Sequence, residues 1–333
     1  MLSGHNCTKK RNSLIQIIRA ISIIAVVIIH TTPDGIYQVI CRPFVNFSVA
    51  TFLFLSGYLT RIENDNWGLF FRKRCSRVII PYIIWTIIYL IPYLYNNGDN
   101  FILVLIKNLL TAKAAGPFYY VLVYIQFVLL TPLLSRLVQS KYIHIGWLVT
   151  PISMIIFTYY PLLQGVQLNN YILTFWDNSC LGWFTYYYLG LILGNRILLP
   201  NYSINKLIFI YIISIFLQMI EGYCFFLCGI GNCGSQIKLS SLITSCIFLL
   251  IIYDILKSTS YNITSRILNS IGNYSFGIYL CHIMVILVLR QIPIYSHVYY
   301  PITSVIVVAI SWAGCYICSI VFGKKASKYL GVM

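Results

Sequence analysis

Two side chains that could do chemistry lie inside the first apolar segment of the sequence, Arg19 and His30. Ionisable groups inside a membrane are costly, so each is a functional candidate. Eleven residues separate them, close to three helical turns, so both project from one helix face about 16 Å apart. Such a face cannot point into lipid, and we expect a polar path with a fixed cation at one end and a titratable base at the other. Taken singly, they could instead be a snorkelling arginine and an interfacial histidine.

Four basic residues, Arg72, Lys73, Arg74 and Arg77, begin the third apolar segment. Arg74 and Arg77 are three apart, so they are neighbours on one helical face. Paired guanidinium groups suit the oxygens of phosphate or pyrophosphate, and the cluster therefore predicts docking of a cytoplasmic anionic cofactor. The alternative is that these charges only set the topology and contact anionic lipid head groups.

Further polar residues interrupt other apolar segments. Tyr279 and His282 are three apart on one face of segment 275–286, where a histidine could relay protons, contact a substrate or be a satisfied structural group. Gln126 and Ser56 could contact a substrate in the same path, or hold helices together through interhelical hydrogen bonds.

Helices must position these residues, because the chain is built from apolar runs near membrane-spanning length. Of 333 residues, 59% are hydrophobic and only 9% are charged, against about a quarter charged in a soluble domain. This excludes a soluble enzyme, and the net charge of +16 is scattered between the runs rather than gathered on a nucleic-acid-binding domain. We predict an all-α integral membrane protein with about ten transmembrane helices, near residues 14–30, 44–61, 78–95, 118–138, 143–160, 181–199, 204–220, 239–256, 274–291 and 299–322.

The distribution of Lys and Arg predicts the orientation, since cytoplasmic loops hold the excess. Seventeen of the 23 fall in the two tails and in alternate loops, and one more, Arg19, lies inside a span. The other loops hold five: Arg42, Lys107, Lys113, Lys238 and Arg290. Both termini are therefore expected in the cytoplasm, with one transmembrane domain over 1–333 and short tails at 1–13 and 323–333. Residues 101–110 are expected at the outer surface and 161–180 in an outer loop.

The eleven cysteines do not form a disulfide framework, because their number is odd and the chain has no small-domain character. Cys224, Cys228 and Cys233 share one predicted outer loop, where a disulfide is conceivable, and the sequence leaves their redox state open. No paired C-x2-C spacing or nearby histidine supports zinc, so no metal is expected.

Five motifs, taken in order, resemble acyltransferase family 3, the multi-pass bacterial membrane O-acyltransferases. The first is the spacing of Arg19 and His30 in "RAISIIAVVIIH". The others are "FLFLSGYL" (52–59), "RKRCSRVIIP" (72–81), "FYYVLVYIQFVLLTPLL" (118–134) and "SFGIYLCHIMVI" (275–286). Each is degenerate alone, but together they cover nearly the whole chain and form a specific signal.

The resemblance implies transfer of an acyl group, usually acetyl, from cytoplasmic acyl-CoA to a hydroxyl of a cell-envelope glycan, across the cytoplasmic (inner) membrane. The expected partners are acyl-CoA, the glycan acceptor and the lipid bilayer, with no nucleic acid. Some family members carry a fused extracytoplasmic domain. None is expected here, so the membrane domain and its outer loops would handle the acceptor.

The resemblance also assigns roles to residues. Arg74 and Arg77, helped by Arg72, would bind the phosphates of acyl-CoA, and its arm would pass Arg19. His30 would be the general base that takes the proton of the acceptor hydroxyl.

Asp34 lies one turn beyond His30 and could orient the imidazole of that residue. Pro33 makes a continued helix between them doubtful, because proline cannot donate a backbone hydrogen bond.

Another class of protein fits much of the same pattern, a transporter or flippase for a small polar solute or a lipid-linked sugar. Arg19, His30 and His282 would then line a proton-coupled path. No inverted repeat is visible, which disfavours this class without excluding it. An assembly subunit of an envelope-polysaccharide complex is a third alternative. The acceptor, the acyl group and the oligomeric state stay open.

Overall fold

The computed structural model of the protein describes residues 2–63, 66–97, 100–198, 202–257 and 265–332. Every regular element in these ranges is helical, which confirms the all-α prediction; helices satisfy their own backbone hydrogen bonds in lipid. The α-helices are α1 (Leu2–Thr31), α2 (Ile36–Cys41), α3 (Phe47–Tyr58), α4 (Trp67–Asn97), α5 (Phe101–Thr111), α6 (Tyr119–Gln139), α7 (Val149–Met154), α8 (Tyr160–Gln164), α9 (Asn170–Asp177), α10 (Phe184–Gly194), α11 (Ile204–Leu227), α12 (Leu239–Lys257), α13 (Arg266–Asn273), α14 (Ser275–Leu289), α15 (Ile302–Val321) and α16 (Gly323–Tyr329). Short 3-10 helices lie between them at η1 (Arg42–Phe44), η2 (Gly116–Phe118), η3 (Ile143–Leu148), η5 (Leu181–Trp183) and η6 (Pro293–His297). The segment η4 (Ile155–Tyr159) is a short π-helix.

Eight segments in the described ranges are long and apolar enough to cross a membrane, and α13 with α14, bent by 78°, would make a ninth. The predicted count of ten is not confirmed. The expected span 181–199 contains α10, whose 11 residues extend about 16 Å, too short for a hydrocarbon core of about 30 Å. Nearly all of α10 is buried in protein. A helix surrounded by other helices is apolar on all sides and therefore resembles a span in sequence.

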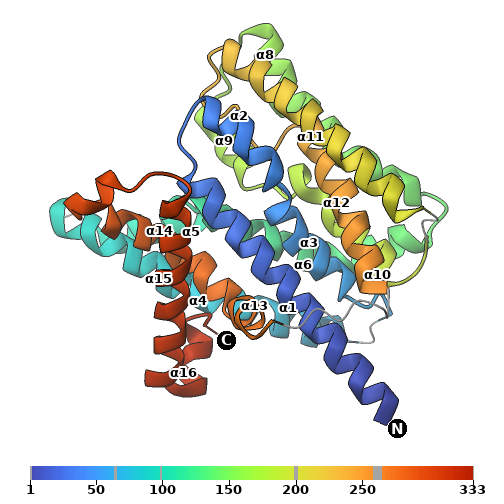
Figure 1. The fold of residues 1–333 in the computed structure, drawn as a ribbon, viewed down its shortest axis with the longest axis horizontal. Coiled ribbons are helices and arrows are strands. Elements are labelled where there is room, and N and C mark those ends of the chain that lie inside the picture. Colours follow the sequence, from blue (N-terminus) through green and yellow to red (C-terminus); the bar gives the residue numbers. More distant parts are fainter. Residues whose placement is uncertain (1, 64–65, 98–99, 199–201, 258–264, 333) are drawn as a thin grey trace.

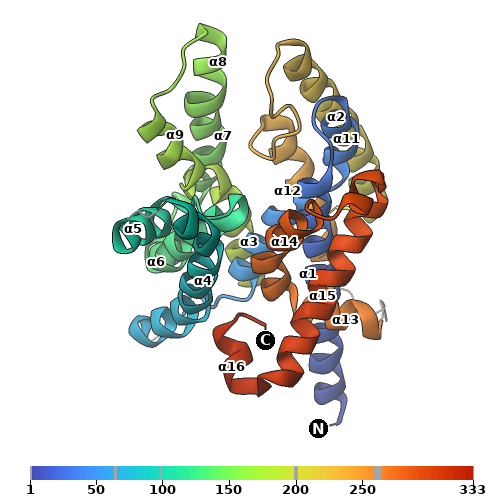
Figure 2. The same cartoon turned by 90° about the vertical axis from the view of Figure 1, so that its left-hand side faces the viewer.

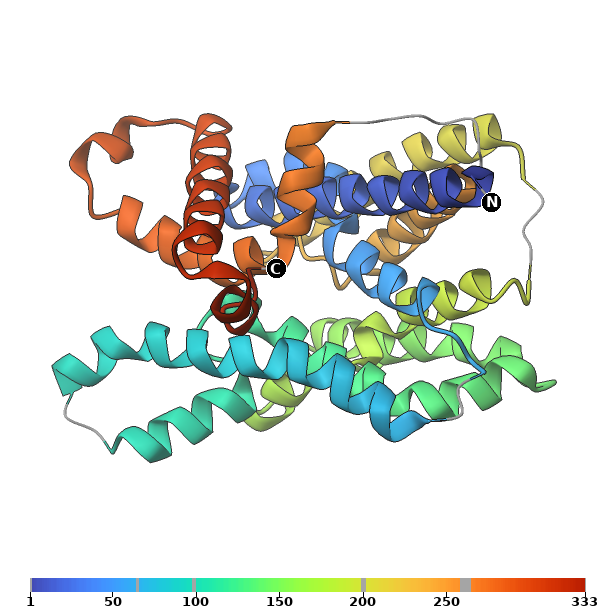
Figure 3. The same ribbon diagram turned by 90° about the horizontal axis from the view of Figure 1, so that it is seen from below.

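The helices form two layers with α3 between them (Figures 2 and 3). One layer holds α4 to α9, and the other holds α1, α2, α11, α12, α14 and α15. The start of α1 and α16 lie at the same end of the bundle (Figure 1). This agrees with an even number of crossings, while the cytoplasmic location of that end stays a prediction.

Both predicted tails are helical in the described residues. The backbone of α1 begins at Leu2, so segment 2–13 extends the first span; the side chains of residues 1–12 lie outside the described part. The C-terminal tail forms α16 and then folds back against α4 and α14. The indole nitrogen of Trp85 donates a hydrogen bond to the Leu330 carbonyl (3.1 Å), and Val332 is buried.

Helices α3 and α10 pack in close backbone contact. A Cβ atom on Gly190 would lie 2.2 Å from the carbonyl oxygen of Phe54, and one on Gly194 would lie 2.2 Å from that of Tyr58. Gly57 of α3 faces Tyr187 of α10 in the same way, at 2.3 Å. Gly190 and Gly194 are four apart, which is the spacing that lets membrane helices approach closely. This contact fixes α3, which carries Ser56, in the centre of the bundle.

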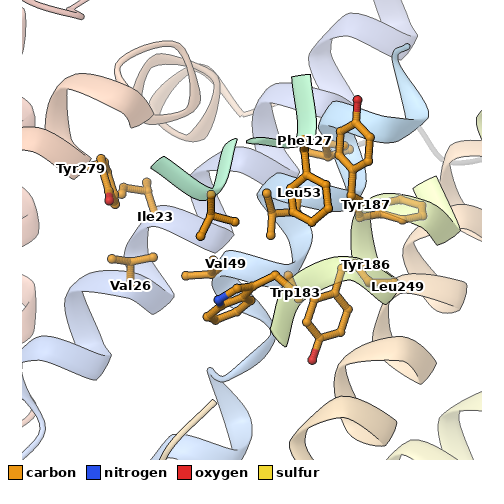
Figure 4. Packing of buried hydrophobic residues seen from close by; sticks show 14 of the residues in the cluster. Ile23, Val26, Val49, Leu53, Phe127, Trp183, Tyr186, Tyr187, Leu249 and Tyr279 are labelled. Atoms are coloured by element: carbon orange, nitrogen blue, oxygen red, sulfur yellow. The ribbon is translucent and has the colours of Figure 1, made fainter. Parts of the chain in front are cut away.

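The core lies between both layers (Figure 4). Phe127 of α6 stacks on Tyr187 of α10 with ring centroids 4.7 Å apart, and the Tyr187 hydroxyl and Thr131 share a hydrogen bond of 2.8 Å. Ile23 of α1 and Leu53 of α3 are fully buried in the same core. The core therefore holds α1 and α3 against α6, and these three helices carry four of the candidate residues, Arg19, His30, Ser56 and Gln126.

Helix α4 begins earlier than predicted, at Trp67 instead of residue 78. The arginine cluster at 72–77 consequently lies on a helix rather than in a loop, so its side chains point in directions fixed by the helical repeat. The expected outer segment 101–110 is the short helix α5, and the expected loop 161–180 contains the end of α8 and helix α9.

Candidate functional site

One cavity of about 580 Å³ lies beside Arg19 and is called here the arginine cavity. Helices α1, α3, α4, α6, α13, α14 and α16 line it, and four of its residues are cationic: Arg19, Arg74, Arg77 and Lys328. No Asp or Glu occurs among the described residues of its wall. Four like charges around one space with no carboxylate favour an anionic ligand, because such a ligand would offset their repulsion.

Arg74 is held at the wall of this cavity by neutral groups. Its guanidinium donates to Ser56 Oγ (3.5 Å) and to Thr60 Oγ1 (3.2 Å), and it lies 5.3 Å from the centre of the Phe70 ring. Ser56 therefore orients Arg74, a role that the sequence did not predict. Hydroxyls and an aromatic face fix the direction of the cation without neutralising it.

Arg19 lies between the arginine cluster and the centre of the bundle. It interacts electrostatically with Tyr120 and Tyr124 of α6 and is repelled by Arg74. Tyr120 and Tyr124 also line the cavity. The shared cavity wall thus offers a polar route from Arg74 and Arg77 of α4 past Arg19 of α1.

A second cavity, of about 490 Å³, lies beside His30 and is called here the histidine cavity. It is formed by the end of α1, by η1 and α3, by the segments around α5, α6 and α9, and by the loop between α11 and α12. Its polar wall includes Arg42, Ser48, Thr111, Lys113, Thr174, Asp177, Asn178, Asn232, Ser235 and Gln236. A wall of amides, hydroxyls and a few charges suits a polyhydroxylated molecule.

His30 is paired with His282, which comes from α14. The ring centroids lie 5.3 Å apart and the planes are tilted by 50°. His282 is fully buried, and its Nδ1 lies 2.7 Å from the carbonyl oxygen of Tyr279 and 3.1 Å from that of Ile278. Carbonyls only accept, so Nδ1 must carry the proton in the neutral ring and Nε2 must carry the lone pair. Nε2 is buried and has no hydrogen-bond partner in the described part of the chain.

The two cavities share three wall residues, Val26, Val49 and Tyr279. These come from α1, α3 and α14 and gather at one edge of the core in Figure 4. The Tyr279 hydroxyl donates a hydrogen bond to the Pro117 carbonyl, which fixes the ring at this boundary. The two cavities therefore adjoin each other at two valines and a tyrosine.

The structure separates three other predicted residues from this route. Arg72 is exposed on α4 and is not part of the arginine cavity wall, because two residues along a helix turn its side chain to another face. The side chain of Gln126 bonds the backbone of Asn178 and Cys180, so it fastens the segment before η5 and lines neither cavity. Asp34 is exposed, and its carboxylate accepts a hydrogen bond from Gln38 (2.6 Å) after the chain leaves the helix at Thr31.

Several wall residues were not predicted from the sequence. Lys328 reaches the arginine cavity from the C-terminal tail, and Arg42 and Trp183 reach the histidine cavity from turns. Arg42 carried a signal, since it is one of the few basic residues outside the loops predicted to be cytoplasmic. Nothing in the sequence marks the other two, because only folding brings them to the cavities.

The cysteines Cys224, Cys228 and Cys233 are free in the structure. Cys224 and Cys228 are exposed, whereas Cys233 is buried with its Sγ 3.4 Å from the Gly35 carbonyl oxygen. No group of three His, Cys, Asp or Glu in the described residues is arranged to hold a metal ion.

Residues 12–320 match the sequence model of an acyltransferase domain, which is nearly the whole chain. Comparisons with curated proteins and with solved structures gave no match. The matched region contains His30, His282 and the three residues shared by the cavities. Lys328 lies beyond it.

Proposed function

The chain belongs to acyltransferase family 3, and from that premise we propose that it is a membrane O-acyltransferase that moves an acetyl or similar acyl group from cytoplasmic acyl-CoA to a hydroxyl of an extracytoplasmic cell-envelope polysaccharide or its lipid-linked precursor. The observation that carries the proposal is the meeting of two cavities beside a histidine pair. One cavity is cationic and the other is lined by polar groups.

Acyl-CoA would occupy the arginine cavity. Arg74, Arg77 and Lys328 suit its phosphate oxygens, since a charge-assisted hydrogen bond is about twice as strong as a neutral one. Its arm would pass Arg19 and carry the thioester to the boundary at Val26 and Val49. The required path along α1 is about 16 Å.

The acceptor would occupy the histidine cavity, with a hydroxyl at His30. In the proposed step, His30 takes the proton of this hydroxyl while its oxygen attacks the thioester carbonyl. The C–S bond breaks as the C–O bond forms, and the proton passes from His30 to the leaving CoA thiolate. The products are an O-acyl ester and free CoA.

His282 would act through His30 as a positioning residue. Its unpartnered Nε2 can accept the N–H of the His30 ring, which leaves the other His30 nitrogen with its lone pair toward the acceptor. The carbonyls of Ile278 and Tyr279 keep His282 in the tautomer that permits this.

The test is acetyl-CoA binding and free-CoA release by purified protein in detergent, with and without extracted envelope polysaccharide. Wild type should bind acetyl-CoA and release CoA faster when the acceptor is present. His30→Gln should bind acetyl-CoA equally well and release CoA about 10²–10⁴ times more slowly. Equal release rates in the two proteins would refute the role of His30.

The same preparation separates this proposal from a carrier. A transporter would move its solute across a liposome membrane without acetyl-CoA. A well-folded wild-type protein that binds no acetyl-CoA would therefore favour the transporter or flippase.

A further inference from the structure

The cations of the histidine cavity outnumber its carboxylates. Arg42 and Lys113 line it, and Asp177 is the only acidic residue of its described wall. Burial raises the pKa of Asp177 above its usual value, although the nearby Lys113 opposes this rise. Asp177 can offset at most one of the two cations, so the described wall keeps an excess of positive charge.

Neutral groups hold Arg42 in place. Its Nη1 donates to Asn232 Oδ1 (2.9 Å) and its Nη2 to the Ile29 carbonyl (3.3 Å). Its Nε is buried and lacks a hydrogen-bond partner in the described part of the chain. Asp34 attracts it electrostatically, but the carboxylate of Asp34 accepts its hydrogen bond from Gln38. A guanidinium has five N–H donors, and the described residues accept from two of them.

The loop between α11 and α12 is built around this cation. A Cβ atom on Gly234 would lie 2.5 Å from Cδ of Arg42, so only glycine lets the loop close over the side chain. The same loop is fastened by Lys238, whose buried Nζ donates to the Cys233 carbonyl (2.8 Å). Gln236 bonds the Asn46 carbonyl and Ser48. Arg42 is thus fixed, and a partly buried cation that forms no ion pair with the described residues is stabilised when an anion binds it.

An aromatic surface adjoins this cation. Tyr119 and Trp183 stack with centroids 5.8 Å apart, and both line the cavity. The apolar face of a sugar ring packs well against such rings, while the amides of Asn178 and Asn232 suit its hydroxyls. The carbonyl that Arg42 holds belongs to Ile29, the residue directly before His30. An anion on Arg42 would therefore lie close to the proposed base.

We propose that the histidine cavity selects an acceptor glycan that carries an oxyanion, a carboxylate or a phosphate, and that Arg42 binds this group while a hydroxyl of the same or the next sugar faces His30. This inference rests on the proposed function and names the substrate class of the site. Arg42 sets specificity, and it takes no part in the proton transfer.

The test measures binding of small anionic sugars and their uncharged counterparts by saturation-transfer NMR. The probes are methyl glycosides of hexuronic acids, each with its methyl ester, and sugar phosphates, each with the free sugar. Wild type should bind at least one anion about ten times more tightly than its neutral counterpart. The two sets of probes show whether the group is a carboxylate or a phosphate.

Arg42→Gln should reduce this preference to less than about twofold, and Arg42→Lys should keep part of it. Lys107→Gln, which removes an exposed charge from α5, is the matched control and should keep the full preference. All variants should bind acetyl-CoA like wild type, which shows that they are folded. A wild type without preference for any anion, or a preference that survives Arg42→Gln, would overturn the inference. A wild-type protein that neither binds acetyl-CoA nor releases CoA from it would instead contradict the proposed function.

Discussion

His30 and His282 come from the first and the penultimate long helices, and their rings meet at 5.3 Å. The two buried carbonyls beside His282 determine its tautomer and leave Nε2 without a partner. A buried unpaired acceptor costs free energy, about 1–3 kcal/mol, unless another group bonds it. The proposed bond from His30 satisfies it and assigns different roles to the two rings.

Replacing His282 should separate turnover from binding. For His282→Gln we expect kcat for CoA release to fall about 10- to 100-fold, while KM for acetyl-CoA stays within about twofold, because the residue acts on His30 and not on the donor. His144→Gln removes an exposed histidine of η3 and should behave like wild type. A rise in KM without a change in kcat would place His282 in donor binding instead.

The cations of the arginine cavity should determine how tightly the protein binds acetyl-CoA. Arg74→Gln with Arg77→Gln should weaken acetyl-CoA binding about tenfold or more, and the loss should shrink at high salt because ionic contacts are screened. Lys73→Gln, on the same helix but exposed, should leave the affinity near that of wild type. Titration calorimetry in detergent measures both. Equal affinities in the double variant and wild type would remove the phosphate site.

At the scale of helices, close glycine contacts between α3 and α10 hold the centre of the bundle. In Gly190→Val, the valine side chain would collide with the Phe54 carbonyl. Helix α3 could avoid this collision only by moving away from α10. We expect a loss of about 3 kcal/mol and a fall in Tm on the order of 10 °C. Gly314→Val on α15, where nothing lies within 4 Å, is the control. Equal Tm values in both variants would show that the close contact does not stabilise the bundle.

The sequence predicted the all-helical class and the residues that share one helix face, because both depend on the periodicity of the sequence. Arg19 and His30 were expected on one helix face. Arg19 lines the arginine cavity, His30 lines the histidine cavity, and Val26 belongs to the walls of both. Arg72 was grouped with Arg74 and Arg77 because all three belong to one basic motif, and the short buried α10 was predicted to be a span. Arg42 and Lys328 could not be assigned, since turns and a folded-back tail bring them to the cavities.

At the scale of the whole molecule, the account requires that donor and acceptor enter from opposite ends and meet at Val26, Val49 and Tyr279. The two layers in Figure 2 and the central helix α3 hold this meeting point between them. In the proposed mechanism, the thioester would reach the acceptor at these three residues.

Filling the meeting point should block transfer while the donor still binds. In Val26→Trp we expect acetyl-CoA affinity within about threefold of wild type and acceptor-dependent CoA release reduced at least about 100-fold, because the reacting groups no longer reach each other. Ile21→Trp adds the same bulk at a 44% exposed position of α1 and should have little effect. Normal release by Val26→Trp would mean that the acyl group takes another route.

The most direct measurement is the sidedness of the donor site in vesicles made from cells that express the protein. Inverted vesicles expose the cytoplasmic face, where we predict both termini, and right-side-out vesicles expose the opposite face; acetyl-CoA does not cross either membrane. With radiolabelled acetyl-CoA added outside, we expect labelled envelope glycan and free CoA only from inverted vesicles, and none from inverted vesicles with His30→Gln. Equal labelling from both orientations, or labelling only from right-side-out vesicles, would contradict transfer between the two cavities.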